Sequence, residues 1–132
     1  MQAKVNVYSK AKDGNKKVSK NFTVKEFQCK DKSDVILIDP VLVDIVQRIR
    51  DYFDKPVIIN SGYRTPSYNK KIDGATYSQH QYGTACDIRI TGVKPETIAK
   101  YAETLLIETG GIGVYKNFVH IDTRVKKSRW KG

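Results

Sequence analysis

The side chains best suited to chemistry are those of His80, Asp87 and His120, and these two histidines are the only ones in the chain. Two imidazoles and one carboxylate form the kind of ligand set that holds catalytic zinc and leaves a fourth position for water. The same residues also fit a plainer interpretation. Each histidine would then be a hydrogen-bonded core or surface residue, and Asp87 would pair with Arg89 or cap a loop.

Strand periodicity gives the candidate ligands a common face. His80 lies in a polar, turn-rich loop (74–83), whereas Asp87 and His120 each lie in an alternating run that is typical of a strand. Alternation predicts a functional face opposite an apolar one, and the functional face carries Asp87, Arg89, Phe118, His120, Asp122 and Arg124. If the two strands are neighbours, the ligands converge, and Gly83 lets the chain turn between His80 and Asp87.

Caps, turns and helical spacing predict the elements that would position this face. Four helices are predicted: a short one from the Thr23–Glu26 capping box with Phe22 and Phe27 inward, a long one from Asp39-Pro40 to Phe53 with Tyr52 inward, one after Pro66 that carries Tyr68 and Ile72, and one from Pro95 to Gly110-Gly111. Strands are predicted at 56–60 and 85–90, and an antiparallel pair of strands at 112–115 and 118–123. Strands and helices are mixed without a strict βαβ repeat. We therefore expect an α+β fold with a small antiparallel sheet flanked by helices.

Composition limits the domain number and suggests a partner. The 132 residues are enough for one domain, and the formal net charge of +10 favours an anionic partner or simple solubility. Residues 1–20 are polar and lysine-rich, so we interpret them as a basic N-terminal arm or an edge strand, and 21–132 as the functional domain. No signal peptide or membrane-crossing run is visible, and we expect Cys29 and Cys86 to be free thiols.

Beyond these patterns, the chain resembles a known superfamily of zinc peptidases. Residues 78–87 match the motif S-x-H-x-x-G-x-A-x-D of the D-Ala-D-Ala carboxypeptidase and L-alanyl-D-glutamate endopeptidase superfamily, which also includes vancomycin-resistance dipeptidases and the Hedgehog fold. Residues 22–27 resemble its entry helix, 61–65 its S-G-Y-R turn, and 111–122 its closing hairpin. The likeness runs from about residue 20 to the end and is greatest for the compact carboxypeptidase C-terminal-domain subgroup, common in phage and prophage proteins.

The resemblance implies a role for each candidate residue. His80, Asp87 and His120 would hold Zn²⁺, and Arg64 would stabilise the oxyanion or hold a substrate carboxylate. Ser78 would orient the first histidine or contact the substrate. The tyrosines Tyr63 and Tyr115 would either line the cleft, where they would contact the substrate, or lie in the core.

One position departs from the family pattern and concerns the general base. Many members carry a catalytic carboxylate three residues before the last histidine, where this chain has Asn117. Asp122 lies two residues after His120, on the same face of a regular strand. It is therefore predicted either to act as the catalytic base or to orient a zinc-bound histidine.

The expected activity is zinc-dependent hydrolysis of peptide bonds in bacterial peptidoglycan, in the stem peptide or the cross-bridge. The enzyme would act at the cell wall as a monomer, after release by lysis or as part of a phage particle or a larger chain. A non-catalytic wall-binding or structural module on the same fold is the first alternative. A nucleic-acid-binding protein is the second, and only the charge favours it, because no nucleic-acid motif is present.

Overall fold

The computed structural model describes residues 4–132, which form a mixed α+β fold built on one five-stranded and one two-stranded sheet. In chain order the elements are β1 (Asn6–Ser9), α1 (Lys10–Asp13), the 3-10 helix η1 (Val24–Phe27), β2 (Val35–Ile38), α2 (Pro40–Phe53), β3 (Ile58–Ser61), α3 (Pro66–Lys71), the 3-10 helix η2 (Gln79–Tyr82), β4 (Ala85–Arg89), α4 (Pro95–Leu105), β5 (Gly111–Val114), β6 (Val119–Asp122) and β7 (Ser128–Lys131). The predicted α+β class is confirmed.

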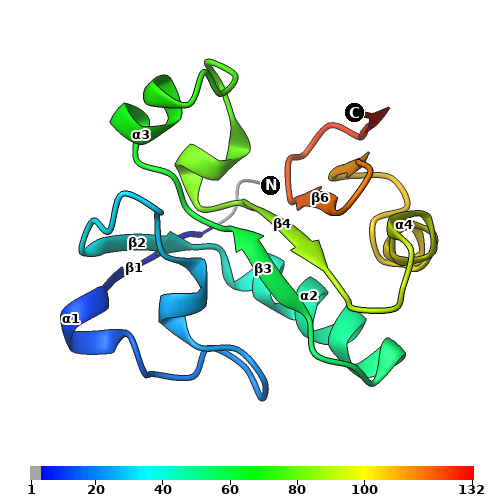
Figure 1. Cartoon of the computed structure of the whole chain (residues 1–132), viewed down its shortest axis with the longest axis horizontal. Helices are drawn as coiled ribbons and strands as arrows, with labels where there is room; N and C mark the ends of the chain where they lie inside the picture. Colours follow the sequence, from blue (N-terminus) through cyan, green and yellow to red (C-terminus); the bar gives the residue numbers. More distant parts are fainter. Residues whose placement is uncertain (1–3) are drawn as a thin grey trace.

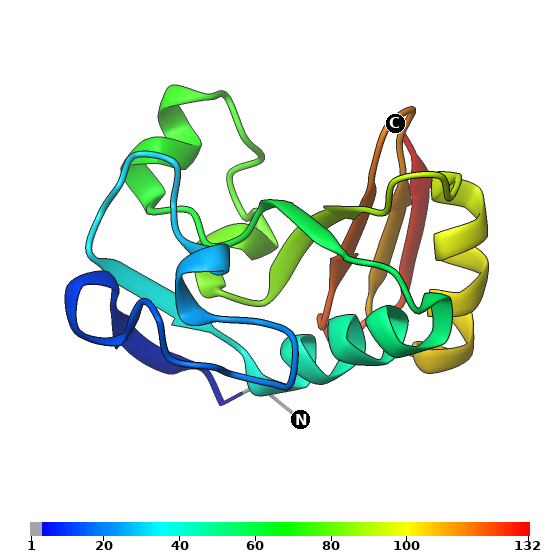
Figure 2. The same cartoon turned by 60° about the horizontal axis from the view of Figure 1, so that its bottom comes forward.

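The five-stranded sheet has the order β3-β4-β6-β5-β7 (Figures 1 and 2). The predicted antiparallel pair near the end of the chain is present as β5 and β6, and β4 pairs with the other side of β6. The prediction of an antiparallel sheet was incomplete, because β7 pairs with β5 in parallel. Two of the four residues of β7 are charged and the segment lacks apolar alternation, so no pattern indicated a strand there.

Helices α2 and α4 pack on the apolar face of this sheet and close the core. Asp39 caps α2, because its side chain accepts a hydrogen bond from the Val41 backbone N–H at 2.9 Å. The inward face of α2 was predicted correctly except at Tyr52, which is 63% exposed and stacks on Tyr101 of α4. Helix α4 ends at Leu105, five residues before the predicted Gly110.

The N-terminal elements form a layer beside the large sheet. Residues 6–9 pair with β2 as an antiparallel strand, the second of the two forms predicted for this segment, while residues 1–3 lie outside the described part. The predicted capping box precedes η1, with Phe22 and Phe27 both buried. The predicted boundary at residue 20 stays a prediction. Within residues 4–132, no helix is long and apolar enough to cross a membrane.

Gly83 ends η2 in a conformation that only glycine adopts easily. Its φ is +73°, and a Cβ would lie 2.6 Å from backbone atoms of Leu37. We expect Gly83→Ala to lower the free energy of unfolding by about 1–2 kcal/mol for the left-handed backbone and by about 1–3 kcal/mol for the overlap. Denaturant unfolding measures the sum.

Gly92→Ala is the matched control for this substitution. Gly92 also has a positive φ, +83°, but the nearest atom to its Cβ would be Lys55 Nζ at 3.5 Å. The Gly92→Ala variant should therefore lose only the part of the unfolding free energy, about 1–2 kcal/mol, that comes from the left-handed backbone. Equal losses in the two variants would contradict the close approach of Gly83 to Leu37.

Candidate metal centre

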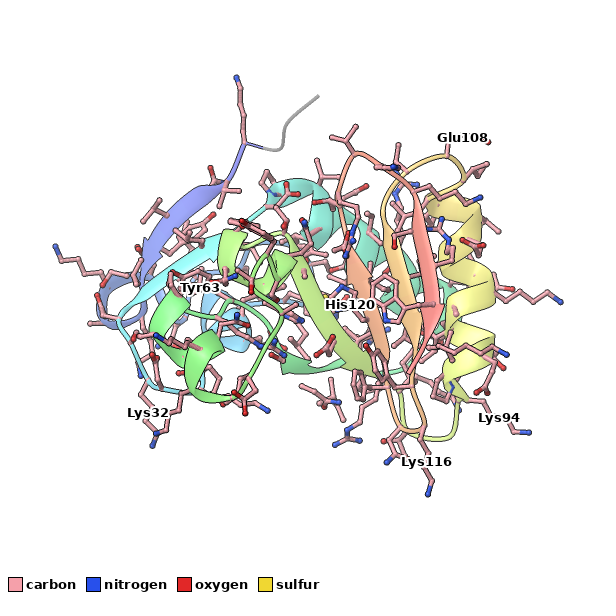
Figure 3. The ribbon with its side chains drawn as sticks, turned by 90° about the horizontal axis from the view of Figure 1, so that it is seen from above. Lys32, Tyr63, Lys94, Glu108, Lys116 and His120 are labelled. Carbon is pink, nitrogen blue, oxygen red and sulfur yellow. The ribbon has the colours of Figure 1, made fainter. Side chains whose placement is uncertain are left out.

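Neighbouring strands bring two of the three candidate ligands face to face. Strand β4 lies beside β6, and Asp87 is paired in register with His120. Figure 3 shows His120 on β6 next to β4. His80 reaches the same point from η2, which turns into β4 through Gly83. The convergence that alternation predicted for neighbouring strands is therefore present, with all three residues buried.

Each histidine is held at its far nitrogen and presents its near nitrogen to Asp87. His80 Nδ1 lies 2.7 Å from the Gly62 carbonyl oxygen, and His80 Nε2 lies 3.4 Å from Asp87 Oδ1. His120 Nε2 lies 2.8 Å from Asp122 Oδ2, and His120 Nδ1 lies 3.0 Å from Asp87 Oδ1. A ring nitrogen that donates to an oxygen leaves the opposite nitrogen free to bind a metal, which is how most metal-bound histidines are fixed.

This donor set fits zinc. The three ligand atoms lie within 4.8 Å of one another. Bond lengths of about 2.0–2.2 Å place two donors of a tetrahedral zinc ion roughly 3.3 Å apart, close to the observed 3.4 and 3.0 Å between each histidine and Asp87. Three protein ligands leave one position open, as in catalytic rather than structural zinc sites.

Hydrogen bonds and burial together shift the pKa values of the site residues. Burial opposes ionisation of Asp87, but hydrogen bonds from His120 and His80 outweigh it and hold the pKa of this carboxyl well below its usual range. Burial likewise favours neutral His120, but hydrogen bonds with Asp122 and Asp87 outweigh it and raise its pKa. The carboxylates therefore attract positive charge to the place where a cation would bind.

Arg64 and Ser78 both lie close to the candidate ligands. Arg64 Nη2 lies 3.7 Å from Asp87 Oδ2, and Arg64 Nε donates to Ser61 Oγ at 3.3 Å. Ser78 caps η2, because its hydroxyl accepts from the His80 backbone N–H at 3.3 Å. Both residues also line the cleft that contains the three ligands.

Asp122 lies behind His120 and has no exposed surface. Besides His120, it binds Arg124, whose Nε and Nη2 atoms donate to its two oxygens at 2.6–3.1 Å. Burial opposes its charge, but the bonds from His120 and Arg124 outweigh it and keep its pKa well below the usual range. Of the two roles predicted for Asp122, this geometry favours orienting His120 over acting as a base.

A cleft of about 490 Å³ opens above the three ligands. One side of it is aromatic and is formed by Tyr115, Phe118 and Trp130. Tyr63 is different, since it is 6% exposed and belongs to the core, the second of its two predicted places. In Figure 3 it lies over the N-terminal elements, apart from His120.

Sequence reasoning missed Trp130. The register across the sheet runs from Asp87 through His120 and Gly113 to Trp130 on β7. Since Gly113 has no side chain, the indole lies over it, and a Cβ there would be 2.4 Å from the indole. The ring centroids of Trp130 and His120 are 5.1 Å apart. The available signal was that Trp130 is the only tryptophan, although nothing in its neighbours indicated a strand.

Carboxylates are scarce in the cleft. Of the described residues that line it, Asp87 is the only one with a carboxylate. Asn117, at the position where the family resemblance led us to expect a catalytic carboxylate, is exposed in the turn between β5 and β6 and does not line the cleft. Among the described residues, the cleft lining therefore offers no carboxylate besides the candidate ligand Asp87.

Several known proteins have sequences similar to that of this chain. A 95-residue alignment with the peptidoglycan L,D-endopeptidase MepK of Escherichia coli K12 is 39% identical and covers 65% of this chain and 51% of that protein. The probable MepK of Haemophilus influenzae is 40% identical over 78 residues, which cover 54% of this chain and 40% of that protein. The zinc D-Ala-D-Ala carboxypeptidase of Streptomyces albus G is 43% identical over 35 residues, which cover 26% of this chain and 14% of that protein.

These alignments span about half or less of each relative's length. The sequence profile of one family, described as Peptidase M15, matches residues 20–122, which include all three candidate ligands, Arg64 and Asp122. Since this match covers well over half of the chain, the protein belongs to the Peptidase M15 family.

Proposed function

We propose that this protein is a zinc-dependent peptidase that hydrolyses peptide bonds of bacterial peptidoglycan. The main support is that both histidines are anchored at one nitrogen and direct the other at Asp87 inside a cleft. The names of the similar proteins, two peptidoglycan endopeptidases and a zinc carboxypeptidase, agree with this activity. We also propose that the fold is of the Hedgehog and D-Ala-D-Ala peptidase type.

In this mechanism His80, Asp87 and His120 hold the metal. A zinc ion there would supply Lewis-acid chemistry, activating water and polarising the scissile carbonyl. The protein would supply the rest of the site. His80 and His120 are fixed before the metal arrives, because Gly62 and Asp122 set the orientation of their rings.

Arg64 is the cation best placed to act on the substrate. Its guanidinium faces the cleft beside Asp87, and its side chain is only 17% exposed. A partly desolvated guanidinium interacts more strongly with negative charge than one in water. We infer that Arg64 stabilises charge on the oxygen of the scissile carbonyl or holds a carboxylate of the substrate.

We infer that the aromatic side of the cleft contacts the peptide substrate and packs against His120. Trp130 Nε1 donates to Tyr115 Oη at 2.9 Å, Arg124 lies 5.3 Å above the indole, and Tyr115 stacks on Phe118. We expect Trp130→Ala to lower kcat/KM about tenfold, the combined effect of one lost aromatic contact and one cation–π contact. The zinc content should stay near that of the wild type.

Two substitutions separate this role from general destabilisation. Gly113→Ala should lower activity in the same direction, since the added methyl group displaces the indole. Tyr52→Ala removes a comparable but exposed aromatic stack on the helical side of the sheet and should leave activity unchanged. If Trp130→Ala cleaves as fast as the wild type, the aromatic side does not contribute to turnover.

A non-catalytic wall-binding module is the alternative that a specific observation favours. Asp87 is the only carboxylate among the described residues of the cleft, and it is also a proposed ligand. Such a module would bind zinc and peptidoglycan without producing new peptide ends. The proposed place of action is the cell wall, with the protein as a monomer delivered by lysis or within a larger particle or chain.

Digestion of intact peptidoglycan tests the activity. The purified protein is incubated with peptidoglycan with and without a zinc chelator, and mass spectrometry identifies the products. New peptide ends that disappear with chelator, and return with added zinc, are the expected result and also name the bond. A zinc-loaded protein that yields no new ends from peptidoglycan of several compositions would favour the non-catalytic module.

A further inference from the structure

The positive charge of the protein lies almost entirely outside the segment that matches its family. Residues 20–122 contain 14 lysines and arginines and 13 aspartates and glutamates, so their net charge is +1. The other 29 residues contain 10 basic residues and one acidic residue, and their net charge is +9. The basic character of this protein is therefore added to a nearly neutral peptidase segment, at both of its ends.

The two basic ends differ in how their charges are used. In the C-terminal group, Arg124 pairs with Asp122 and Arg129 pairs with Glu103, so two of the five cations are already neutralised. In the N-terminal group, the ammonium groups of Lys10, Lys12 and Lys16 have no carboxylate oxygen within 4.0 Å. Across residues 4–132, the positive partner of every ion pair is an arginine or a histidine. None of these three lysines is neutralised by an ion pair, and Lys16 Nζ lies 6.0 Å from the centre of the Tyr8 ring.

These lysines converge on one pocket. Lys10, Lys12 and Lys16 line a depression of about 350 Å³ together with Lys25, which lies just inside the matched segment. The other side chains that line it belong to alanine, asparagine and glutamine, so it contains no carboxylate, arginine or aromatic ring. A second depression shares Lys25 and Gln28 and adds Lys30, but it also contains the carboxylate of Glu26. We call the first depression the lysine pocket.

The backbone that carries the lysine pocket is fixed. The Lys10 N–H donates to the Asp34 carbonyl at 2.7 Å, the Lys25 N–H to the Gly14 carbonyl at 3.0 Å, and the Val24 N–H to the Lys16 carbonyl at 3.0 Å. Three carboxylates lie nearby: Asp34 accepts from Ser9 Oγ and the Ala11 N–H, Asp13 from the Ser9 N–H, and Glu26 from the Thr23 N–H. None of them forms an ion pair with a lysine. The hydrogen bonds from Ser9 and Ala11, and then the charges of Lys10 and Lys12, lower the pKa of Asp34.

We propose that the lysine pocket binds an anionic polymer of the cell wall whose charges are phosphodiesters, of the poly(glycerol phosphate) type. Lysine ammonium groups bind phosphate as point charges, whereas an arginine fork, absent here, suits a planar carboxylate. Without aromatic rings the pocket offers no stacking platform for bases, which disfavours single-stranded nucleic acid. The choice of a wall polymer rests on the proposed function.

The placement of the pocket suits retention of the enzyme at its substrate. Figure 1 shows α1, which contributes Lys10 and Lys12, at the end of the molecule opposite α4 and away from β6 with its ligand His120. A polymer bound there would leave the cleft open. Binding at this surface would keep the enzyme near the wall and raise the local concentration of peptide bonds.

The test compares two variants of equal net charge, each carrying His80→Ala to remove turnover. The pocket variant has Lys10, Lys12, Lys16 and Lys25 replaced by glutamine, and the control variant has the exposed Lys55, Lys70, Lys94 and Lys100 replaced by glutamine. Binding to purified poly(glycerol phosphate) is measured over a range of salt concentrations. Seven of the eight lysines are exposed and Lys10 is half-buried, so circular dichroism verifies that both variants fold.

At about 0.15 M salt we expect the pocket variant to bind at least tenfold more weakly than its parent, and the control variant less than threefold more weakly. The slope of log affinity against log salt should fall by roughly 3, the value for four contacts on a single-stranded polyanion. Equal losses in the two variants would overturn the proposal, because net charge alone would then explain binding.

Binding to two other anionic polymers tests which chemical class of polymer the lysine pocket binds. Poly-γ-glutamate and duplex DNA should bind the parent more weakly than poly(glycerol phosphate), and equal or tighter binding of either through the same lysines would overturn the phosphodiester wall polymer. Cleavage is scored separately with the intact site. A protein that binds the polymer but does not cleave peptidoglycan contradicts only the proposed function, and one that cleaves without binding contradicts only the lysine pocket.

Discussion

Replacing His80 by alanine should remove zinc and peptidase activity together. Structural zinc sites with four ligands have apparent binding free energies of about 10–16 kcal/mol, so one ligand accounts for roughly 3–4 kcal/mol, or two to three orders of magnitude in affinity. His80 is 3% exposed and held by Gly62, so no nearby side chain can replace it without moving η2. At micromolar protein and zinc concentrations, the two remaining ligands, at roughly 6–8 kcal/mol together, should leave the variant with much less metal than the wild type.

Zinc content by mass spectrometry of the native protein and release of new peptide ends are the two readouts. Gln81→Ala is the matched control, since Gln81 lies one position further along η2 and its side chain binds backbone oxygens of Thr76 and Ser78 outside the ligand set. It should retain both metal and activity. Wild-type zinc content in folded His80→Ala protein would contradict the assignment of His80 as a ligand.

The convergence of the site was predictable because it depends on a local rule. Alternation in β4 and β6 predicted which side chains share a face, and it needed only that the strands be neighbours. The structure supplies that condition, with Asp87 opposite His120. The cap of α2 at Asp39 and the capping box before η1 were predictable for the same reason, since each is encoded within four residues.

What could not be predicted depends on pairing between distant segments. Strand β2 is a four-residue apolar run, too short for its period to be recognised, and it is defined by its pairing with β1. Strand β7 is held by parallel pairing with β5, which brings Trp130 to the cleft from a segment that shows no strand pattern. Tyr52 fits the apolar spacing of α2, but it lies in the last turn, where the partner is Tyr101 of α4 and not the core.

The role of Asp122 was also undecidable from the sequence, because a base and an orienting carboxylate occupy the same strand position. The structure separates them by burial, since both oxygens of Asp122 are bonded and neither lines the cleft. We expect Asp122→Asn to weaken zinc binding by about 10–100-fold, the usual effect of losing a carboxylate behind a metal-bound histidine. It should leave substantial turnover once zinc is saturating.

Saturation with zinc is what distinguishes the two roles. Loss of a general base costs about 10²–10⁴-fold in rate however much metal is present, whereas loss of an orienting group is largely repaired by more metal. Asp122→Asn keeps the volume of the side chain, and Asp44→Asn, at an exposed ion pair with Arg48, is the control for removing one carboxylate. That control should change unfolding by at most about 1 kcal/mol and leave zinc affinity unchanged. If folded Asp122→Asn protein stays inactive at saturating zinc, then Asp122 is the base, and His120 must move to uncover it during the reaction.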